Sequence, residues 1–241
     1  MSEPDKQLFR FKQFAVDQTG CAMKINTDGV LLGSFAAVDN LKTILDIGTG
    51  TGVIALMLAQ SYPDAQIDAV EIDEAAATTA GSNFSGSPFA DRLAIYATTF
   101  QEYFENHPDK KYDLIVSNPP FYIDSLISPA ARKNLAKHTD INFFNNLIIN
   151  SLSHLTEQGT LWLILPINTA EMVKAIAMQN QLHLQKNITL QSFEHDQPHR
   201  EVIALGLQQK PLAKERFVIY DAPQIYSQQY RRALANFFIA F

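Results

Sequence analysis

The segment between residues 43 and 71 constrains the fold of this 241-residue sequence more than any other. An apolar run at Thr43–Ile47 leads into a glycine-rich loop at 46–52, and a helical pattern at 53–60 and a second apolar run at Gln66–Glu71 follow. Glycine lets the backbone turn tightly and approach a ligand closely, and the start of a helix offers unpaired N–H groups. The order strand, loop, helix, strand therefore predicts an α/β fold with a ligand site at the end of the first strand.

The same alternation of short apolar runs and longer helical patterns continues beyond residue 71. We expect strands at 93–96, Tyr112–Ser117 and 161–165, and helices at 74–83, 142–155 and 170–179. The last third changes character, because 184–193 and 202–208 alternate like antiparallel strands without a long helix between them. The sequence thus predicts a mostly parallel sheet with an antiparallel end.

Length, charge and composition further limit the number of domains and the kinds of partner that this protein can have. We expect one domain over 1–241, in which 1–40 form an N-terminal extension with a capped helix starting near Thr27, and 41–241 form the core. The net charge of -6 indicates that any nucleic acid must bind through a local basic patch. The single cysteine excludes an intrachain disulfide, the histidines lack metal-ligand spacing, and the longest apolar run is too short to span a membrane. We expect a cytoplasmic protein without a metal.

The loop 46–52 has the spacing Gly-x-Gly-x-Gly with an acidic residue before it. A dinucleotide-binding loop would need a glycine at the sixth position, where this sequence has Val53. The pattern instead resembles the S-adenosylmethionine loop of class I methyltransferases, which implies that the loop backbone holds the methionine part and that Glu71 binds the ribose hydroxyls. Many of these enzymes carry an acid after the third strand, where Thr98 and Thr99 stand here. The alternative is a glycine-rich turn with no ligand.

The tetrapeptide Asn118-Pro119-Pro120-Phe121 directly follows the fourth expected strand. The prolines fix the backbone and remove two donors, so the Asn118 side-chain oxygen and the Pro119 carbonyl remain as acceptors. Such a pair can accept both hydrogens of an amino group and stabilise the positive charge that grows on its nitrogen during methyl transfer. Phe121 can stack on a flipped-out base. These four residues form the predicted catalytic site, and a stiff loop without chemistry is the alternative.

Further segments narrow the resemblance and extend it over nearly the whole chain. They are F-x-F-K-Q-F at 9–14, C-A-M-K-x-x-T-D-G at 21–29, L-L-G at 31–33 and P-H-R at 198–200. Together with the loop and N-P-P-F they resemble the bacterial tRNA1(Val) (adenine(37)-N6)-methyltransferase family.

This resemblance implies a Rossmann-like sheet of seven strands with a reversed C-terminal strand. It also implies S-adenosyl-L-methionine as cofactor, the anticodon loop of a tRNA as substrate, and an N-terminal segment that closes over the cofactor near the reacting base. The cofactor-binding residues expected on this basis are Lys24, Thr27, Asp46, Gly48, Thr49, Gly50, Gly52, Glu71, Ile72, Thr99 and Asn118.

Two clusters of basic residues are candidates for binding RNA. One follows N-P-P-F and contains Arg132, Lys133, Lys137 and His138, which suit the phosphates around a flipped base. The other contains Arg10 and Lys12, which lie among the aromatic residues Phe9, Phe11 and Phe14, a mixture that suits single-stranded nucleotides. We interpret Arg231 and Arg232 near the C-terminus as a solvated surface.

The main functional hypothesis is therefore methylation of N6 of an adenine in RNA. A second hypothesis keeps the chemistry and changes the target to a protein glutamine or a DNA adenine, although such relatives usually add a recognition domain for which this chain has no room. A third is a non-catalytic module that binds S-adenosylmethionine or RNA, against which the intact loop and Asn118 argue.

Overall fold

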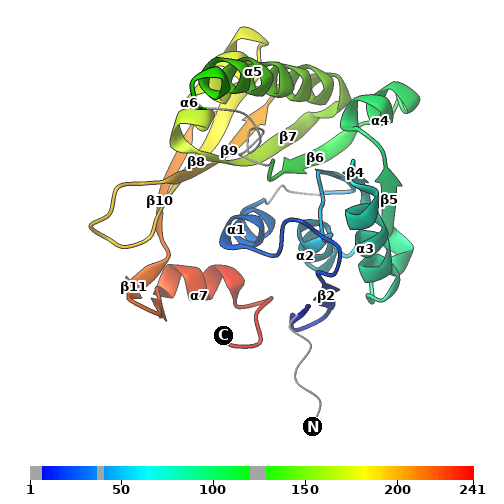
Figure 1. Cartoon of the computed structure of the whole chain (residues 1–241), viewed down its shortest axis with the longest axis vertical. Coiled ribbons are helices and arrows are strands. Elements are labelled where there is room, and N and C mark those ends of the chain that lie inside the picture. The colour runs from blue at the N-terminus through cyan, green and yellow to red at the C-terminus, as the bar shows by residue number, and fades with distance from the viewer. Residues whose placement is uncertain (1–6, 37–40, 120–128) are drawn as a thin grey trace.

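The computed structural model describes residues 7–36, 41–119 and 129–241, the last range without the side chains of 129–140. In these residues one eight-stranded sheet runs through the centre of the molecule (Figure 1). In spatial order its strands are β10 (Ala213–Val218), β8 (His183–Gln191), β9 (Arg200–Gly206), β7 (Leu155–Pro166), β6 (Tyr112–Ser117), β3 (Thr43–Ile47), β4 (Gln66–Glu71) and β5 (Leu93–Ala97). Strand β9 is antiparallel to both of its neighbours, and every other neighbouring pair is parallel.

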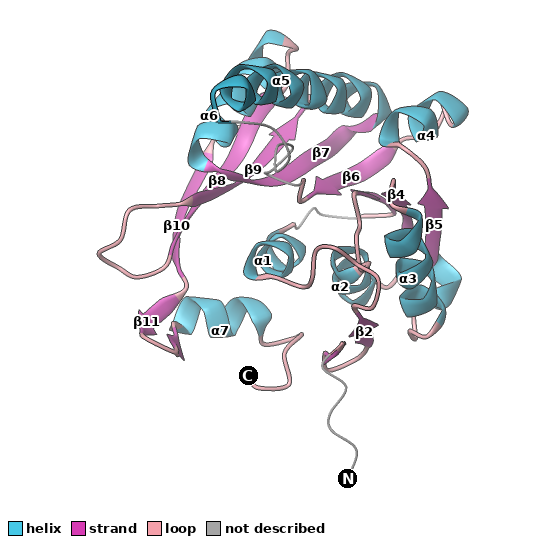
Figure 2. Ribbon diagram, in the orientation of Figure 1, coloured by secondary structure: helices cyan, strands magenta, loops and turns pink. Residues whose placement is uncertain are grey.

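Helices cover both faces of this sheet (Figure 2). On one face lie α1 (Thr27–Phe35), α2 (Val53–Ser61), α3 (Glu74–Ser85) and α7 (Gln228–Leu234), and on the other lie α4 (Phe100–Asn106), α5 (Pro129–His154) and α6 (Ile167–Gln179). A single 3-10 turn, η1 (Ala90–Arg92), precedes β5. No helix in the described part of the chain has the length and apolarity that crossing a membrane requires.

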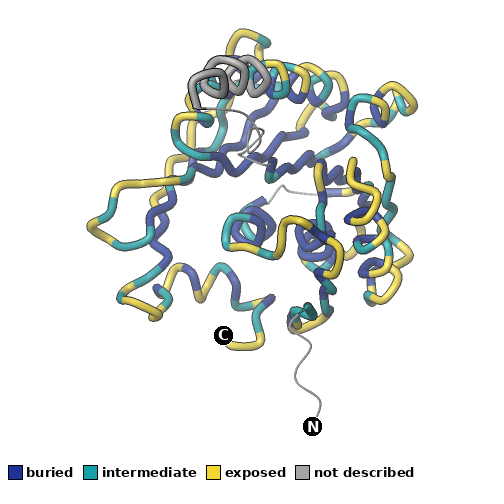
Figure 3. Tube along the Cα trace, in the orientation of Figure 1, coloured by how far each residue is buried: buried dark blue, intermediate teal, exposed yellow. Residues whose placement is uncertain are grey.

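The central strands are apolar on both sides because both sides are buried. Successive side chains of a strand point to opposite faces, and so Ile44 packs in the core beneath α1 and α2 while Leu45 packs in the core beneath α4 to α6. Figure 3 shows these strands as buried along most of their length. The Rossmann-like, mostly parallel sheet with a reversed strand near the C-terminus is confirmed.

The sheet contains one strand more than the seven that the family resemblance implies. The additional strand, β10, lies at the edge beside β8, and its first four residues, A-K-E-R, are exposed. A charged edge strand has no apolar pattern, and so the sequence offers no signal for it.

The N-terminal extension contains a small hairpin as well as the expected helix. Strands β1 (Leu8–Arg10) and β2 (Ala15–Asp17) pair with each other, and Phe11 forms a backbone bridge with Phe238 near the C-terminus. Helix α1 begins after Asn26, whose side chain accepts a hydrogen bond from the Gly29 amide at 2.8 Å. A second small pair, β11 (Tyr220–Ala222) and β12 (Ile225–Tyr226), follows β10.

The glycine loop between β3 and α2 depends on left-handed backbone conformations. Gly48 has a φ of 71° and Gly52 a φ of 82°. A Cβ atom on Gly52 would lie 2.5 Å from Cε1 of Phe84, a buried ring of α3, whereas a Cβ on Gly48 would meet nothing within 4 Å. Gly52 therefore serves the packing of α2 against α3, and Gly48 faces open space.

We expect Gly52→Ala to lower the free energy of unfolding by ~2–4 kcal/mol. The left-handed conformation is sterically unfavourable for alanine, and its Cβ atom also collides with Phe84. Gly48→Ala is the matched control and should lower the free energy of unfolding by only ~1–2 kcal/mol, because the left-handed conformation is its single source of strain. Urea unfolding followed by circular dichroism measures both. Equal losses in the two variants would show that the Phe84 ring does not constrain the loop.

Candidate active site

A cavity of about 490 Å³ lies at the carboxyl ends of β3, β4 and β6. Its walls come from 21–26, 47–51, 70–73, 98–101 and 117–119, together with two residues of α2 and one each of α1, α3 and α5. The volume falls within the range of small-molecule sites, about 300–1,000 Å³. The sheet order reverses between β3 and β6, and open α/β sheets bind ligands at this switch point.

The glycine loop and the acid after β4 form one wall of this cavity. Glu71 is almost fully buried, and its Oε2 accepts a hydrogen bond from the Gly50 amide at 2.8 Å while its Oε1 accepts one from the Asp73 amide at 3.0 Å. The Gly48 and Thr49 amides both donate to the Val70 carbonyl, at 2.8 and 3.1 Å. The carboxylate is thereby held beside the loop, as the predicted pairing of loop and acid requires.

Asp46 lies behind the loop and outside the cavity lining. Its side chain is fully buried, and its Oδ2 accepts a hydrogen bond from the Thr49 hydroxyl at 2.6 Å. Burial raises the pKa of Asp46 to about 7, against the opposing effect of hydrogen bonds from the Thr49 hydroxyl and the Ala55 amide. Asp46 therefore shapes the loop from beneath, and Gly52 and Thr27 also lie outside the lining.

Asn118 and Pro119 line the opposite wall, at the end of β6. The Oδ1 of Asn118 is buried, and no donor among the described residues reaches it. The preceding Ser117 is fixed, because its hydroxyl donates to the Ile47 carbonyl at 2.8 Å and so ties β6 to β3. A buried amide oxygen without a donor costs about 1–3 kcal/mol, which a ligand N–H can recover. Pro120 and Phe121, the other two predicted catalytic residues, lie outside the described residues.

Thr98 and Thr99 line the wall after β5, and both also contact Glu102 of α4. The Thr98 hydroxyl donates to Glu102 Oε2 at 2.6 Å, and the Thr99 hydroxyl accepts from the Glu102 amide at 3.1 Å as the cap of α4. The Thr98 hydroxyl hydrogen is therefore used by Glu102, whereas the Thr99 hydroxyl, which accepts in its cap contact, keeps its own hydrogen. Gln101 also lines this wall, and sequence reasoning missed it because it follows no motif.

The N-terminal extension supplies the remaining wall. Lys24 is exposed and lines the cavity beside Cys21. Asn83 of α3, which the sequence did not single out, holds the hairpin to the loop: its Nδ2 donates to the carbonyls of Asp17 and Thr51 at 2.8 and 2.9 Å. An ion pair of 2.9 Å between Asp28 and Arg200 joins α1 to β9.

The shape and chemistry of the groups in these walls suit the parts of S-adenosyl-L-methionine. Cβ atoms on Gly48 and Gly50 would meet nothing within 4 Å, so the loop leaves its side of the cavity open to a ligand. The side chain of Ile72 is an apolar surface, 71% exposed, that suits a flat purine. The carboxylate of Glu71 suits hydroxyl donors, and the Asn118 oxygen needs a donor.

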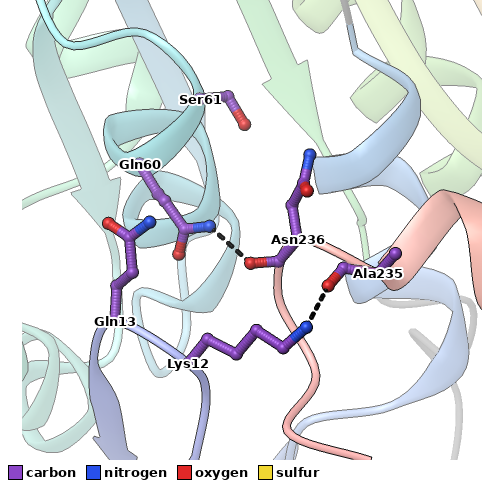
Figure 4. Close-up of a pocket in the computed structure, with 6 residues that line it drawn as sticks. All are labelled: Lys12, Gln13, Gln60, Ser61, Ala235 and Asn236. Atoms are coloured by element: carbon purple, nitrogen blue, oxygen red, sulfur yellow. Dashed lines mark hydrogen bonds between the residues drawn. The ribbon is translucent and has the colours of Figure 1, made fainter. Parts of the chain in front are cut away.

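The structure separates the second candidate RNA-binding cluster, Arg10 and Lys12, from this cavity. The Lys12 ammonium donates to the carbonyls of Ala235 and Phe241 at 2.5 and 2.7 Å. It lies in a groove between the hairpin, α2 and the C-terminal segment, where Figure 4 shows its bond to Ala235. Neither Arg10 nor Lys12 lines the glycine-loop cavity.

The proposal that the neighbouring aromatic rings stack on nucleotides was wrong for Phe11 and Phe14. Both rings are buried in the core, where they stack on each other with centroids 4.4 Å apart. The side chains of Arg132, Lys133, Lys137 and His138, all on α5, lie outside the description. The described residues contain no group of three His, Cys, Asp or Glu side chains that could hold a metal ion.

Comparison with known proteins agrees with this geometry. The model of the methyltransferase small domain family matches residues 24–189. A tRNA1(Val) (adenine(37)-N6)-methyltransferase of Pedobacter heparinus is 44% identical over 98% of this chain and 100% of its own, and one of Bacteroides thetaiotaomicron is 39% identical over 96% and 97%.

Solved structures show the same fold at low identity. A predicted O-methyltransferase of Agrobacterium tumefaciens is similar with a TM-score of 0.69 and 15% identity, over 87% of this chain and 96% of its own. TrmN from Thermus thermophilus gives a TM-score of 0.56 and 17% identity, over 74% and 47%. At such identities the likeness concerns the fold alone. The identities of the curated relatives over almost the whole chain show more: this protein belongs to the tRNA1(Val) (adenine(37)-N6)-methyltransferase family.

Proposed function

We propose that this protein methylates N6 of an adenine in RNA with S-adenosyl-L-methionine, and that the adenine is position 37 in the anticodon loop of tRNA1(Val). The observation that carries the chemistry is the buried Oδ1 of Asn118 at the cavity wall, which no donor among the described residues reaches. The names of the relatives support the choice of substrate. A tRNA partner also implies that the protein works in the cytoplasm.

The cofactor, when bound, would supply an electrophilic methyl group on its sulfonium sulfur, whose S–C bond breaks as the methyl group leaves, so that S-adenosylhomocysteine is released. We assign its methionine end to the backbone of Gly48, Thr49 and Gly50, and its ribose hydroxyls to the carboxylate of Glu71. The adenine end would lie against Ile72, with the Gln101 amide and the Thr99 hydroxyl as candidate polar contacts, because the Thr98 hydroxyl already donates to Glu102. Lys24 closes this side from the N-terminal extension.

The target amine is bound by acceptors. The Asn118 oxygen and the Pro119 carbonyl each accept one N–H of the exocyclic amino group, which directs the nitrogen lone pair toward the methyl group. As the N–C bond forms, the nitrogen becomes positive, and the same two oxygens stabilise that charge. The nitrogen then loses one proton to water, so no strong general base is required.

We expect the RNA around the target base to be bound mainly by residues 121–138, whose side chains are not among those the structure describes. We assign stacking on the flipped adenine to Phe121 and phosphate contacts to Arg132, Lys133, Lys137 and His138. Arg10 is exposed and stays a candidate for a more distant phosphate, whereas the Lys12 ammonium serves the C-terminal segment.

Replacing Asn118 by alanine removes the acceptor that orients the amine. We expect Asn118→Ala to lower the methyl-transfer rate by at least ~100-fold, the scale of losing one charge-stabilising group, while cofactor affinity changes by no more than a few fold. Methyl transfer to tRNA and calorimetric titration with S-adenosyl-L-methionine measure the two effects. Asn146→Ala, on the exposed side of α5, is the matched control and should retain full activity. Full activity in Asn118→Ala would refute the assigned chemistry.

Glu71→Gln tests the ribose contact. A hydrogen bond to a charged group contributes about 1.5–3 kcal/mol, and so we expect at least a tenfold weaker affinity for S-adenosyl-L-methionine, measured by calorimetry. Glu74→Gln changes an exposed acid at the start of α3 and should leave the affinity as in the wild type. If both variants bind equally well, the ribose is held elsewhere.

The substrate is tested by mass spectrometry of nucleosides after incubation with the protein and cofactor. We expect N6-methyladenosine in tRNA1(Val), and none when adenine 37 is replaced by guanine, because the amino group to be methylated is then missing. A DNA oligonucleotide containing adenine and a release-factor protein serve as competing substrates. Methylation of either competitor, with the tRNA unmodified, would replace the RNA assignment by one of the alternatives.

A further inference from the structure

Five aromatic rings form a continuous stack at the end of β8 and β10. In order they are Tyr230, Tyr226, Tyr220, Phe193 and His195. The centroids of successive rings lie 4.4, 5.1, 5.7 and 5.9 Å apart, and the successive interplanar angles are 8°, 22°, 36° and 13°. Three of the four successive pairs are stacked, and the Phe193–Tyr220 pair in the middle is tilted by 36°. Offset stacking of this kind is a favoured geometry for aromatic pairs.

The stack runs from the core to the solvent. Tyr230 at its inner end is buried, whereas the side chain of His195 at its outer end is 84% exposed. Among the described residues no further ring stacks on His195 beyond Phe193. An exposed ring at the end of a stack contributes little to the core, and its outer face offers a flat surface for one more ring.

The loop that carries Phe193 and His195 is held in place by polar contacts. The Arg216 Nε donates to Gln191 Oε1 at 2.7 Å, and the Gln191 Nε2 donates to the carbonyls of Phe193 and Glu194 at 2.7 and 2.9 Å. The Arg216 guanidinium also forms an ion pair with the Glu194 carboxylate at 2.9 Å. These contacts fix the backbone that carries Phe193, on whose ring His195 stacks, and a fixed backbone lowers the entropy cost of binding a partner.

This loop lies on the same edge of the sheet as the cavity. Strands β8 and β10 run parallel to β6, and Figure 1 shows the loop after β8 beside β10 and β11. Strand β8 stands three strand positions from β6, ~14 Å across the sheet. Asn187 is level with Ser117 through their pairs with Ile203 and Leu163, and β8 continues to Gln191, ~13 Å further. A few nucleotides of single strand span such a distance.

We propose that His195, backed by the ring stack, is a platform on which an unpaired base of the substrate RNA stacks while the target adenine occupies the cavity. Histidine and other aromatic side chains receive splayed-out bases in this way, and stacking tolerates any base because each has a π-face. The platform lies apart from the glycine loop and from Asn118. It rests on the proposed function, because its partner is the RNA that carries the target adenine.

Three substitutions of His195 separate stacking from charge. The probe is the anticodon stem-loop of tRNA1(Val), bound to the full-length protein in the presence of S-adenosylhomocysteine, with the dissociation constant measured by fluorescence anisotropy. We expect His195→Ala to raise the dissociation constant about tenfold. His195→Phe should keep the wild-type value because it keeps a ring, and His195→Lys should lose affinity although it adds a charge. His183→Ala, at the opposite end of β8, is the matched control and should bind normally.

A second measurement identifies the base. Abasic sites are placed one at a time at each unpaired nucleotide other than adenine 37, and each RNA is titrated against wild type and His195→Ala. We expect one position whose abasic site weakens binding to wild type and adds nothing to the loss in His195→Ala, because both changes remove the same contact.

The outcomes distinguish the platform from the proposed function. If wild type binds and methylates this RNA while His195→Ala and every abasic site act independently, the platform is refuted and the function stands. A His195→Lys variant that binds as well as wild type would also refute stacking, because charge would then suffice. If wild type neither binds nor methylates the stem-loop or the whole tRNA, the RNA assignment fails and the platform fails with it.

Discussion

The chemistry of the site depends on the buried oxygen of Asn118, which no donor among the described residues reaches. A protein that leaves an acceptor buried without a donor loses about 1–3 kcal/mol of stability, and the packing of the surrounding residues has to offset this loss. Ser117 fixes the end of β6 through its bond to the Ile47 carbonyl. Gly29 of α1 lies near the Asn118 amide, since a Cβ atom added to it would stand 3.7 Å from Asn118 Nδ2. Such violations of ordinary polar satisfaction are expected at functional sites.

The cavity exists because distant parts of the chain are joined around it. The extension supplies one wall, and it is held on one side by Asn83 and on the other by the Asp28–Arg200 ion pair. Its hairpin is joined in turn to the C-terminal segment, where the Lys12 ammonium binds the Phe241 carbonyl. The hairpin of β1 and β2 and the C-terminal segment thus support the site, although neither carries its chemistry.

Much of the central fold could be predicted from the sequence, because its signals are local. Strands buried on both faces read as unbroken apolar runs, as at Tyr112–Ser117, and the glycine loop and Glu71 stand at the ends of such runs. Edge elements gave no such signal: β10 is charged and exposed, and the hairpin of β1 and β2 is only three residues long on each side.

Side-chain partners were the least predictable part of the site. Lys12 lies beside aromatic residues in the sequence, but its partners are more than 220 residues away along the chain. The same holds for Phe11 and Phe14, whose burial depends on the C-terminal segment and on Phe89, and for Thr99, whose hydroxyl is used by a helix cap. Motifs identified the loop and Asn118 because their chemistry depends on neighbours in sequence, and missed Gln101 because its role depends on neighbours in space.

A crystal structure of the protein with S-adenosylhomocysteine and a short RNA containing the target adenine tests the central claim most directly. The account predicts that the exocyclic amino nitrogen of that adenine lies within about 3.2 Å of both Asn118 Oδ1 and the Pro119 carbonyl oxygen, facing the cofactor sulfur. An adenine bound with its amino group turned away from Asn118, or a cofactor bound outside the glycine-loop cavity, would contradict it.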